Sequence, residues 1–158
     1  MILYHGSNRV IETPDISFSR SNTDFGRGFY TTPVREQAFR WASRYKRKGD
    51  SAIVTIYDCD NTLLENGPSV KRFSGYTEEW LDYIVACRSG QPVQGYDIVV
   101  GGVANDKVFD TIELYLQQLI DKQAAIGRLQ YERPNLQVCF CSQDVIRKHL
   151  IFLGSEEL

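Results

Sequence analysis

The chain has 158 residues, a formal net charge of −2 and 42% hydrophobic residues, a profile typical of one folded domain. A net charge so close to zero argues against a protein built mainly to coat nucleic acid or an anionic membrane. No apolar run approaches the roughly 18 residues of a membrane helix, and the N-terminus lacks the pattern of a signal peptide. We therefore expect a single domain over residues 1–158 that is cytoplasmic and does not bind membranes.

The cysteines give no sign of a metal centre. Cys59, Cys87, Cys139 and Cys141 show no CxxC spacing and no nearby pair of histidines. Cys139 and Cys141 are two residues apart in a predicted strand, where they point to one face and are poorly placed to bond each other. We expect reduced thiols and no bound metal.

The N-terminal half predicts strands on either side of a helix. An apolar run at residues 2–4 predicts a strand that ends at His5-Gly6. After a long polar loop, Thr32-Pro33 predicts a helix start, because threonine caps helices and proline fits the first helical position. Residues 52–57 predict a second strand, and residues 62–64 a short extended segment.

The C-terminal half continues this mixture of helices and strands. Thr77 opens a predicted helix whose first turn is acidic, as the helix dipole favours. A strand is predicted at residues 96–100, and a helix at residues 108–119. Residues 135–141 alternate between apolar and polar side chains and predict a strand, and a last strand is predicted at residues 148–153. The order of these elements predicts an α+β fold.

A histidine and a glycine end the first predicted strand. His5 can offer a ring nitrogen to a ligand hydroxyl, and Gly6 allows a ligand to approach the backbone closely. The alternative is a structural histidine whose ring is hydrogen-bonded inside the core.

A glycine-rich loop precedes the first predicted helix. Residues 24–32 read DFGRGFYTT. Glycine-rich backbone before a helix can hold phosphate, Arg27 suits a diphosphate, and Tyr30 offers a flat face for an aromatic ligand. The alternative is an ordinary turn that carries a surface arginine and leads into an aromatic core.

Taken together, LYHGS, GRGFYTT and QAFRWA resemble the ADP-ribosyltransferase family, in the branch related to diphtheria toxin and the poly(ADP-ribose) polymerases. The resemblance is closest to a family of uncharacterised bacterial domains, domain-of-unknown-function family 3990. It rests on DFGRGFYTT…QAFRWA, on YDIVVGGVANDKV at residues 96–108 and on NLQVCFCSQDVI at residues 135–146. It implies one α+β domain in which split mixed β-sheets and flanking helices surround an NAD cleft.

The resemblance also implies roles for single residues. NAD would be the substrate, with a ribose hydroxyl held by His5, the nicotinamide carboxamide bound to the Gly6 backbone and the nicotinamide ring stacked on Tyr30. The complete set of expected NAD contacts is His5, Gly6, Ser7, Arg27, Gly28, Phe29, Tyr30 and Asn105.

Glutamine replaces an expected glutamate at the catalytic position. The family glutamate lies on a strand and helps an oxocarbenium-like state to form, and the matching residue here is Gln137. Glutamine has no charge, and losing one such partner commonly costs on the order of a hundredfold in rate. The strand alternation nevertheless places Gln137 opposite the apolar side chains, in the expected cleft.

Another carboxylate could replace the missing charge. Asp106, or Asn105 beside it, would lie at the cleft, although Asn105 can equally be the N-cap of the third helix. Asp24 is a weaker candidate. The expected catalytic residues are Gln137, Asp106 and Tyr30.

These expectations lead to an NAD-dependent ADP-ribosyltransferase that cleaves the nicotinamide–ribose bond and passes ADP-ribose to a macromolecular acceptor. The resemblance implies a bacterial toxin or effector, which would need a neutralising antitoxin or immunity protein. Two alternatives remain open. One is an NAD glycohydrolase, and the other is a catalytically silent domain that binds NAD, ADP-ribose or a protein partner.

Overall fold

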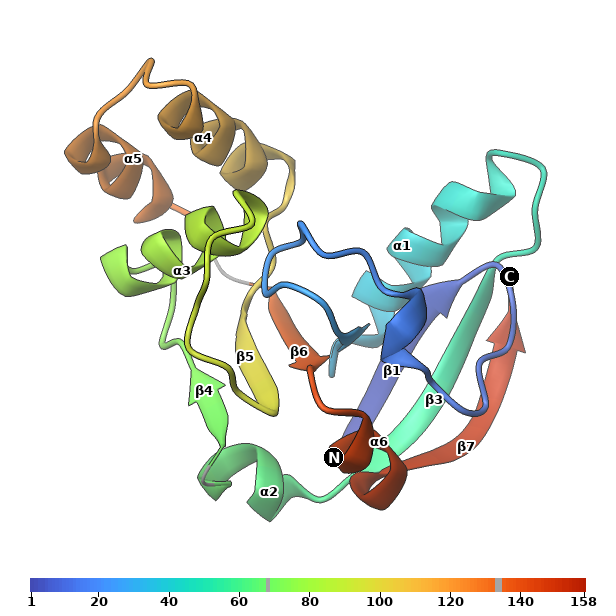
Figure 1. The fold of residues 1–158 in the computed structure, drawn as a ribbon. Coiled ribbons are helices and arrows are strands. Elements are labelled where there is room, and N and C mark those ends of the chain that lie inside the picture. The colour runs from blue at the N-terminus through green and yellow to red at the C-terminus, as the bar shows by residue number, and fades with distance from the viewer. Residues whose placement is uncertain (68, 133–134) are drawn as a thin grey trace.

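The structure is a computed structural model that describes residues 1–67, 69–132 and 135–158. It is an α+β fold with two β-sheets, as the sequence predicts (Figure 1). The strands are β1 (Ile2–Ser7), β2 (Phe29–Thr31), β3 (Ile53–Cys59), β4 (Val70–Arg72), β5 (Ile98–Gly102), β6 (Leu136–Phe140) and β7 (Leu150–Glu157). The helices are the short 3₁₀ helix η1 (Ile16–Phe18), α1 (Arg35–Lys46), α2 (Asn61–Asn66), α3 (Glu78–Arg88), α4 (Asp106–Leu116), α5 (Lys122–Leu129) and α6 (Gln143–His149).

The two sheets meet at one point. The first sheet has the order β1-β3-β7 and is antiparallel throughout. The second has the order β2-β6-β5-β4 and is mixed, because β4 runs parallel to β5 while the other pairs are antiparallel. An isolated bridge between Tyr4 and Thr32 connects β1 to the end of β2. This junction brings the N-terminal strand beside the glycine-rich loop.

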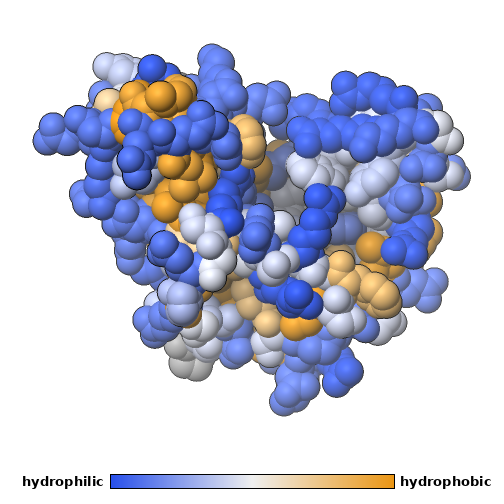
Figure 2. Space-filling model, turned by 45° about the horizontal axis from the view of Figure 1, so that its top comes forward, coloured by the Kyte–Doolittle hydropathy of each residue, from blue (hydrophilic) through white to orange (hydrophobic). Residues whose placement is uncertain are grey.

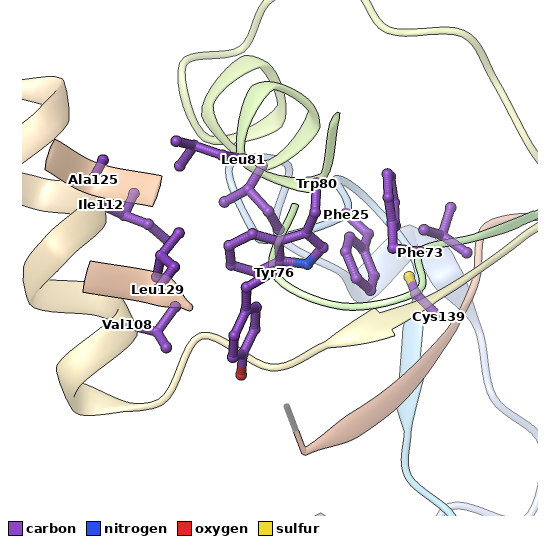
Figure 3. Close-up of a cluster of buried hydrophobic side chains, with 12 residues drawn as sticks. Phe25, Phe73, Tyr76, Trp80, Leu81, Val108, Ile112, Ala125, Leu129 and Cys139 are labelled. Atoms are coloured by element: carbon purple, nitrogen blue, oxygen red, sulfur yellow. The ribbon is translucent and has the colours of Figure 1, made fainter. Parts of the chain in front are cut away.

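Three hydrophobic cores separate four layers. The first lies between α1 and the outer face of the first sheet, and the second fills the space between the two sheets. The third lies between the second sheet and the helices α3, α4 and α5. In Figure 3, Trp80 and Leu81 of α3 lie between Ile112 of α4 and Phe25 and Cys139 on the sheet side. These helices therefore form one end of the molecule, and α1 lies at the other (Figure 1).

The first helix begins later than the sequence predicts. Thr32 is held in the bridge to Tyr4, and its hydroxyl accepts a hydrogen bond from the Val34 amide instead of capping a helix that starts at Pro33. The helix begins at Arg35 and ends at Lys46. The chain then turns at Gly49, whose φ of 86° favours glycine.

Two other segments differ from the prediction. Residues 62–64 are helical because Asp60 caps α2 by accepting a hydrogen bond from the Thr62 amide. The helix predicted at residues 108–119 ends at Leu116, before Gln118 with its φ of 60°, and Asp121 then caps the separate helix α5. In the described ranges, no helix is both long enough and apolar enough to cross a membrane.

Candidate functional site

His5 contacts Tyr30 across the junction of the two sheets. The His5 Nδ1 atom lies 2.7 Å from the carbonyl oxygen of Tyr30. The imidazole ring also packs against Phe29, with 4.4 Å between ring centroids. β1 and the strand after the glycine-rich loop therefore hold the ring from two sides.

This contact fixes the tautomer of His5. A carbonyl oxygen can only accept a hydrogen bond, so Nδ1 carries the proton. Burial lowers the pKa of His5 below its ordinary value of 6.5, and the bond to the Tyr30 carbonyl opposes this only in part. The ring is therefore neutral at pH 7, and Nε2 has a free lone pair. Among the described residues, Nδ1 alone of the two ring nitrogens has a hydrogen-bond partner.

Gly6 is where β1 and α1 approach most closely. A Cβ at this position would lie 2.4 Å from the carbonyl oxygen of Ala38 and 3.0 Å from the amide nitrogen of Ala42. Both are backbone atoms of α1, so a larger residue would push the helix away from the strand. Glycine is therefore required here by packing.

The backbone of Gly6 faces the junction. The N–H and C=O of Tyr4 bond to Thr32, at 2.8 and 2.9 Å, and so point away from β3. Because alternate residues of a strand direct these groups to the same edge, the N–H and C=O of Gly6 face the same side. β1 is an edge strand, and within the described residues its pairing on this side ends at the Tyr4–Thr32 bridge. Among the described residues these peptide groups have no strand partner, and Gly6 itself is buried.

Tyr30 is fixed by the loop that precedes it. Its hydroxyl donates to the Gly26 carbonyl at 2.6 Å and accepts from the Phe25 amide at 3.0 Å. Its ring stacks on Phe25, with 6.4 Å between centroids. Burial raises the pKa of Tyr30 well above its ordinary range, so the hydroxyl stays protonated. The side chain cannot swing away about its Cα–Cβ bond without breaking these bonds.

Gln137 shares a sheet face with Tyr30. Tyr30 lies opposite Cys139 in the pairing of β2 with β6, and Gln137 is two residues from Cys139 on the same strand. Both side chains therefore point to one face. Gln137 is buried, and its Nε2 donates to Asp24 and to the Gly102 carbonyl, each at 3.2 Å.

Asp24 is a carboxylate beside Gln137. Arg88, the last residue of α3, bonds to Asp24 Oδ1 at 2.6 Å through Nη2 and at 3.1 Å through Nε. The other carboxylate oxygen accepts from Gln137 and, at 3.4 Å, from the Ala104 amide. The Asp24 and Arg88 side chains are only 14% and 16% exposed. We call Asp24, Arg88 and Gln137 the buried polar network.

This network explains why glutamine suits position 137. A glutamate there would place a second carboxylate against Asp24 and the Gly102 carbonyl, where no hydrogen could be donated. Sequence reasoning ranked Asp24 low and missed Arg88. A single arginine at the end of a helix gives no sign that it turns inward to a loop 64 positions earlier.

Several other predicted contacts have structural roles. Asn105 caps α4 by accepting from the Val108 amide at 3.0 Å, and the Ser7 hydroxyl donates to the Arg9 carbonyl at 2.6 Å. The Phe29 ring is buried between the sheets, and a Cβ at Gly28 would lie 2.4 Å from Cys139 Sγ.

The two charged residues of the predicted site are exposed. Asp106 is the first residue of α4, and Arg27 lies on the surface of the loop. In the described part of the chain, neither forms an ion pair. Asp24, and not Asp106, is therefore the carboxylate that contacts Gln137.

The surface is hollowed between the two ends of the molecule. Figure 2 shows a hollow between the side that carries α4 and α5 and the side that carries α1, and β1, β2 and β6 lie between those sides in Figure 1. Two cavities of about 260 and 560 Å³ lie elsewhere, the first around Tyr83 and the second around Lys122. None of the expected NAD contacts lines either cavity. Across the described ranges, no group of three or more His, Cys, Asp or Glu side chains could hold a metal ion.

Comparison with known proteins identifies a family. A family model described as "Protein of unknown function (DUF3990)" matches residues 1–152. No curated protein and no solved structure matches the chain.

Proposed function

The chain belongs to the DUF3990 family, and we propose that it is an NAD-dependent ADP-ribosyltransferase whose substrate binds where the two sheets meet. The observation that carries the proposal is the contact between β1 and the glycine-rich loop. There a neutral histidine with a free Nε2, a glycine edge with unpaired peptide groups and a fixed tyrosine lie on neighbouring strands.

Each of these groups suits one part of NAD. The lone pair on His5 Nε2 can accept a hydrogen bond from a ribose hydroxyl. The N–H and C=O of Gly6 complement a carboxamide, which has one acceptor and two donors. The ring of Tyr30 offers a face on which nicotinamide stacks. Because the loop already fixes the tyrosine, little ordering is needed when the ligand binds.

The proposed reaction breaks the bond between nicotinamide and ribose. The bonding electron pair leaves with nicotinamide, the ribose carbon becomes positively charged, and a nucleophile of the acceptor adds to it. A carboxylate would stabilise that positive charge, but Gln137 is neutral and the Asp24 carboxylate is already bound to Arg88. Holding and orienting NAD would therefore provide most of the rate enhancement, and turnover would be slow.

The same network favours a second candidate function. Because the buried carboxylate is neutralised by Arg88, the domain could hold NAD or ADP-ribose without cleaving it. A transferase of this kind would act as a toxin or effector on a macromolecule and would need a neutralising protein. A silent binder would modify no macromolecule and would need no neutralising protein.

The test is the release of free nicotinamide from NAD by the purified protein, with and without cell extract. Release that requires extract supports transfer of ADP-ribose to an acceptor. Release in plain buffer would assign the protein as a glycohydrolase, and NAD binding without any release would assign it as a silent binder. Tyr30→Phe keeps the ring but loses the hydroxyl, and it should retain more activity than Tyr30→Ala.

A further inference from the structure

Two thiols lie side by side at the end of β6, Cys139 on the strand and Cys141 just after its last residue, next to the proposed NAD site but without a role in it. Cys139 and Cys141 point to the same face of the strand, and their sulfur atoms are 3.7 Å apart. Both cysteines are free. Cys139 also lies directly opposite Tyr30 in the sheet.

The placement of the two cysteines favours chelation of one ion by both sulfurs over a disulfide between them. Residues two apart in an extended segment have Cα atoms about 6.7 Å apart, near the upper limit of disulfide spacing, so the pair is poorly placed for a disulfide. Two sulfurs that bind one tetrahedral ion with bonds of about 2.3 Å lie about 3.8 Å apart. The pair is therefore better placed for chelation than for a disulfide.

We propose that Cys139 and Cys141 form a two-sulfur binding site for a thiophilic metal or metalloid ion. The proposal does not depend on NAD binding. It rests on the spacing of the sulfurs, their shared face and the partial exposure of Cys141.

Access assigns an order to the two thiols. Cys141 is half-buried, whereas Cys139 has no exposed surface. Cys141 is therefore the first sulfur to bind an incoming ion, and Cys139 closes the chelate.

The small number of protein sulfurs at this site limits the kinds of ion that it can bind. Cys87, on α3, is also buried. Across the described residues, no group of three or more such ligands could hold a metal ion. The site therefore suits a centre that needs only two protein sulfurs, such as a trivalent organic arsenical, which keeps its own third substituent.

Phenylarsine oxide is the matching probe, because its arsenic takes two neighbouring thiols. Two arsenic–sulfur bonds form, and the arsenic-bound oxygen leaves as water with the two thiol protons. The oxidation states of arsenic and sulfur do not change, so no oxidant is needed.

The experiment is intact-mass spectrometry of the reduced protein after treatment with phenylarsine oxide. We expect one arsenical per chain, stable to a monothiol and removed by a dithiol. Cys141→Ser should abolish this adduct, and so should Cys139→Ser. Cys59→Ser and Cys87→Ser are the matched controls and should keep it.

The proposal is overturned if the parent protein forms no adduct, if Cys141→Ser keeps it, or if Cys87→Ser loses it. Circular dichroism establishes that each variant is folded. Because Cys141 is half-buried, its serine variant remains informative even if the fully buried Cys139 tolerates no change. The readout involves no NAD, so failure of the proposed ADP-ribosyltransferase function would leave this result unchanged.

Discussion

The β1 edge at His5 and Gly6 differs from the β6 face at Gln137 in whether its polar groups already have hydrogen-bond partners. On β1, the Nε2 atom of His5 has no hydrogen-bond partner among the described residues, and the peptide groups of Gly6 face the junction beyond the Tyr4–Thr32 bridge. On β6, the Gln137 amide nitrogen and the Asp24 carboxylate are bound to each other, to Arg88 and to Gly102. The comparison separates two tasks: one region offers groups for binding, and the other keeps its charge neutralised.

The largest expected effect comes from opening the buried polar network. Arg88→Ala leaves the Asp24 carboxylate buried without its cation, and the free energy of unfolding should fall by about 4 kcal/mol. Urea denaturation measures this change. The matched control is Arg35→Ala, which removes an exposed ion pair with Glu156 and should cost less than about 1 kcal/mol. Equal losses in the two variants would show that the Asp24–Arg88 pair is not buried.

A second change tests why position 137 is not acidic. Gln137→Glu places a second carboxylate against Asp24, and we expect a loss of about 3 kcal/mol that becomes smaller at low pH as one carboxyl group takes up a proton. The double variant Asp24→Asn/Gln137→Glu exchanges the charged and neutral groups and should recover most of the stability. Additive losses in a double-mutant cycle would contradict the contact.

A third change tests the binding region. Gly6→Ala puts a methyl group against backbone atoms of α1, and overpacking of this kind should cost about 2 kcal/mol. It should also weaken NAD binding by displacing the strand edge. Gly95→Ala is the control, because nothing lies within 4 Å of a Cβ at that position. Similar stabilities for the two variants would mean that α1 does not rest on Gly6.

The smallest expected effect is a dependence on pH. The pKa of His5 is lowered from 6.5 in the folded protein, so below that pH the unfolded chain binds more protons than the folded one. Stability should therefore decrease as the pH falls from 6.5 toward the pKa of the folded state, and become independent of this residue at still lower pH. His5→Gln should remove this part of the profile. Identical profiles for the parent and His5→Gln would place the ring in water.

The sequence predicted most of the fold because its signals are local. β6 alternates along five residues, and Thr77 caps α3 as predicted. Strands form at both ends of the chain, but β1 continues to Ser7 and β7 runs from Leu150 to Glu157, after α6 has taken up residues 148–149. The predicted helix ends were wrong where a contact with a distant strand or a single turn residue decides the structure. Thr32 forms a bridge with a distant strand instead of capping a helix, and the turn at Gln118 ends α4 at Leu116, before the predicted end at residue 119.

The candidate site was predictable only in part. His5, Gly6 and Tyr30 stand in short motifs, whereas the pairing of Asp24 with Arg88 depends on how α3 packs against the loop. No spacing in the sequence encodes that packing. The sequence predicted Asp106 as a carboxylate beside the cleft, but the structure places it on the surface.

The most direct test of the central proposal is calorimetric titration of NAD into the parent protein and into four variants. We expect the parent to bind NAD, His5→Ala and Tyr30→Ala to abolish binding, and the two controls to keep it. The controls are His149→Ala, which changes the histidine at the end of α6, and Tyr131→Ala, which changes a tyrosine that is 82% exposed. The proposed NAD site would be contradicted if the parent does not bind NAD. It would also be contradicted if His5→Ala and Tyr30→Ala bind NAD as tightly as the parent.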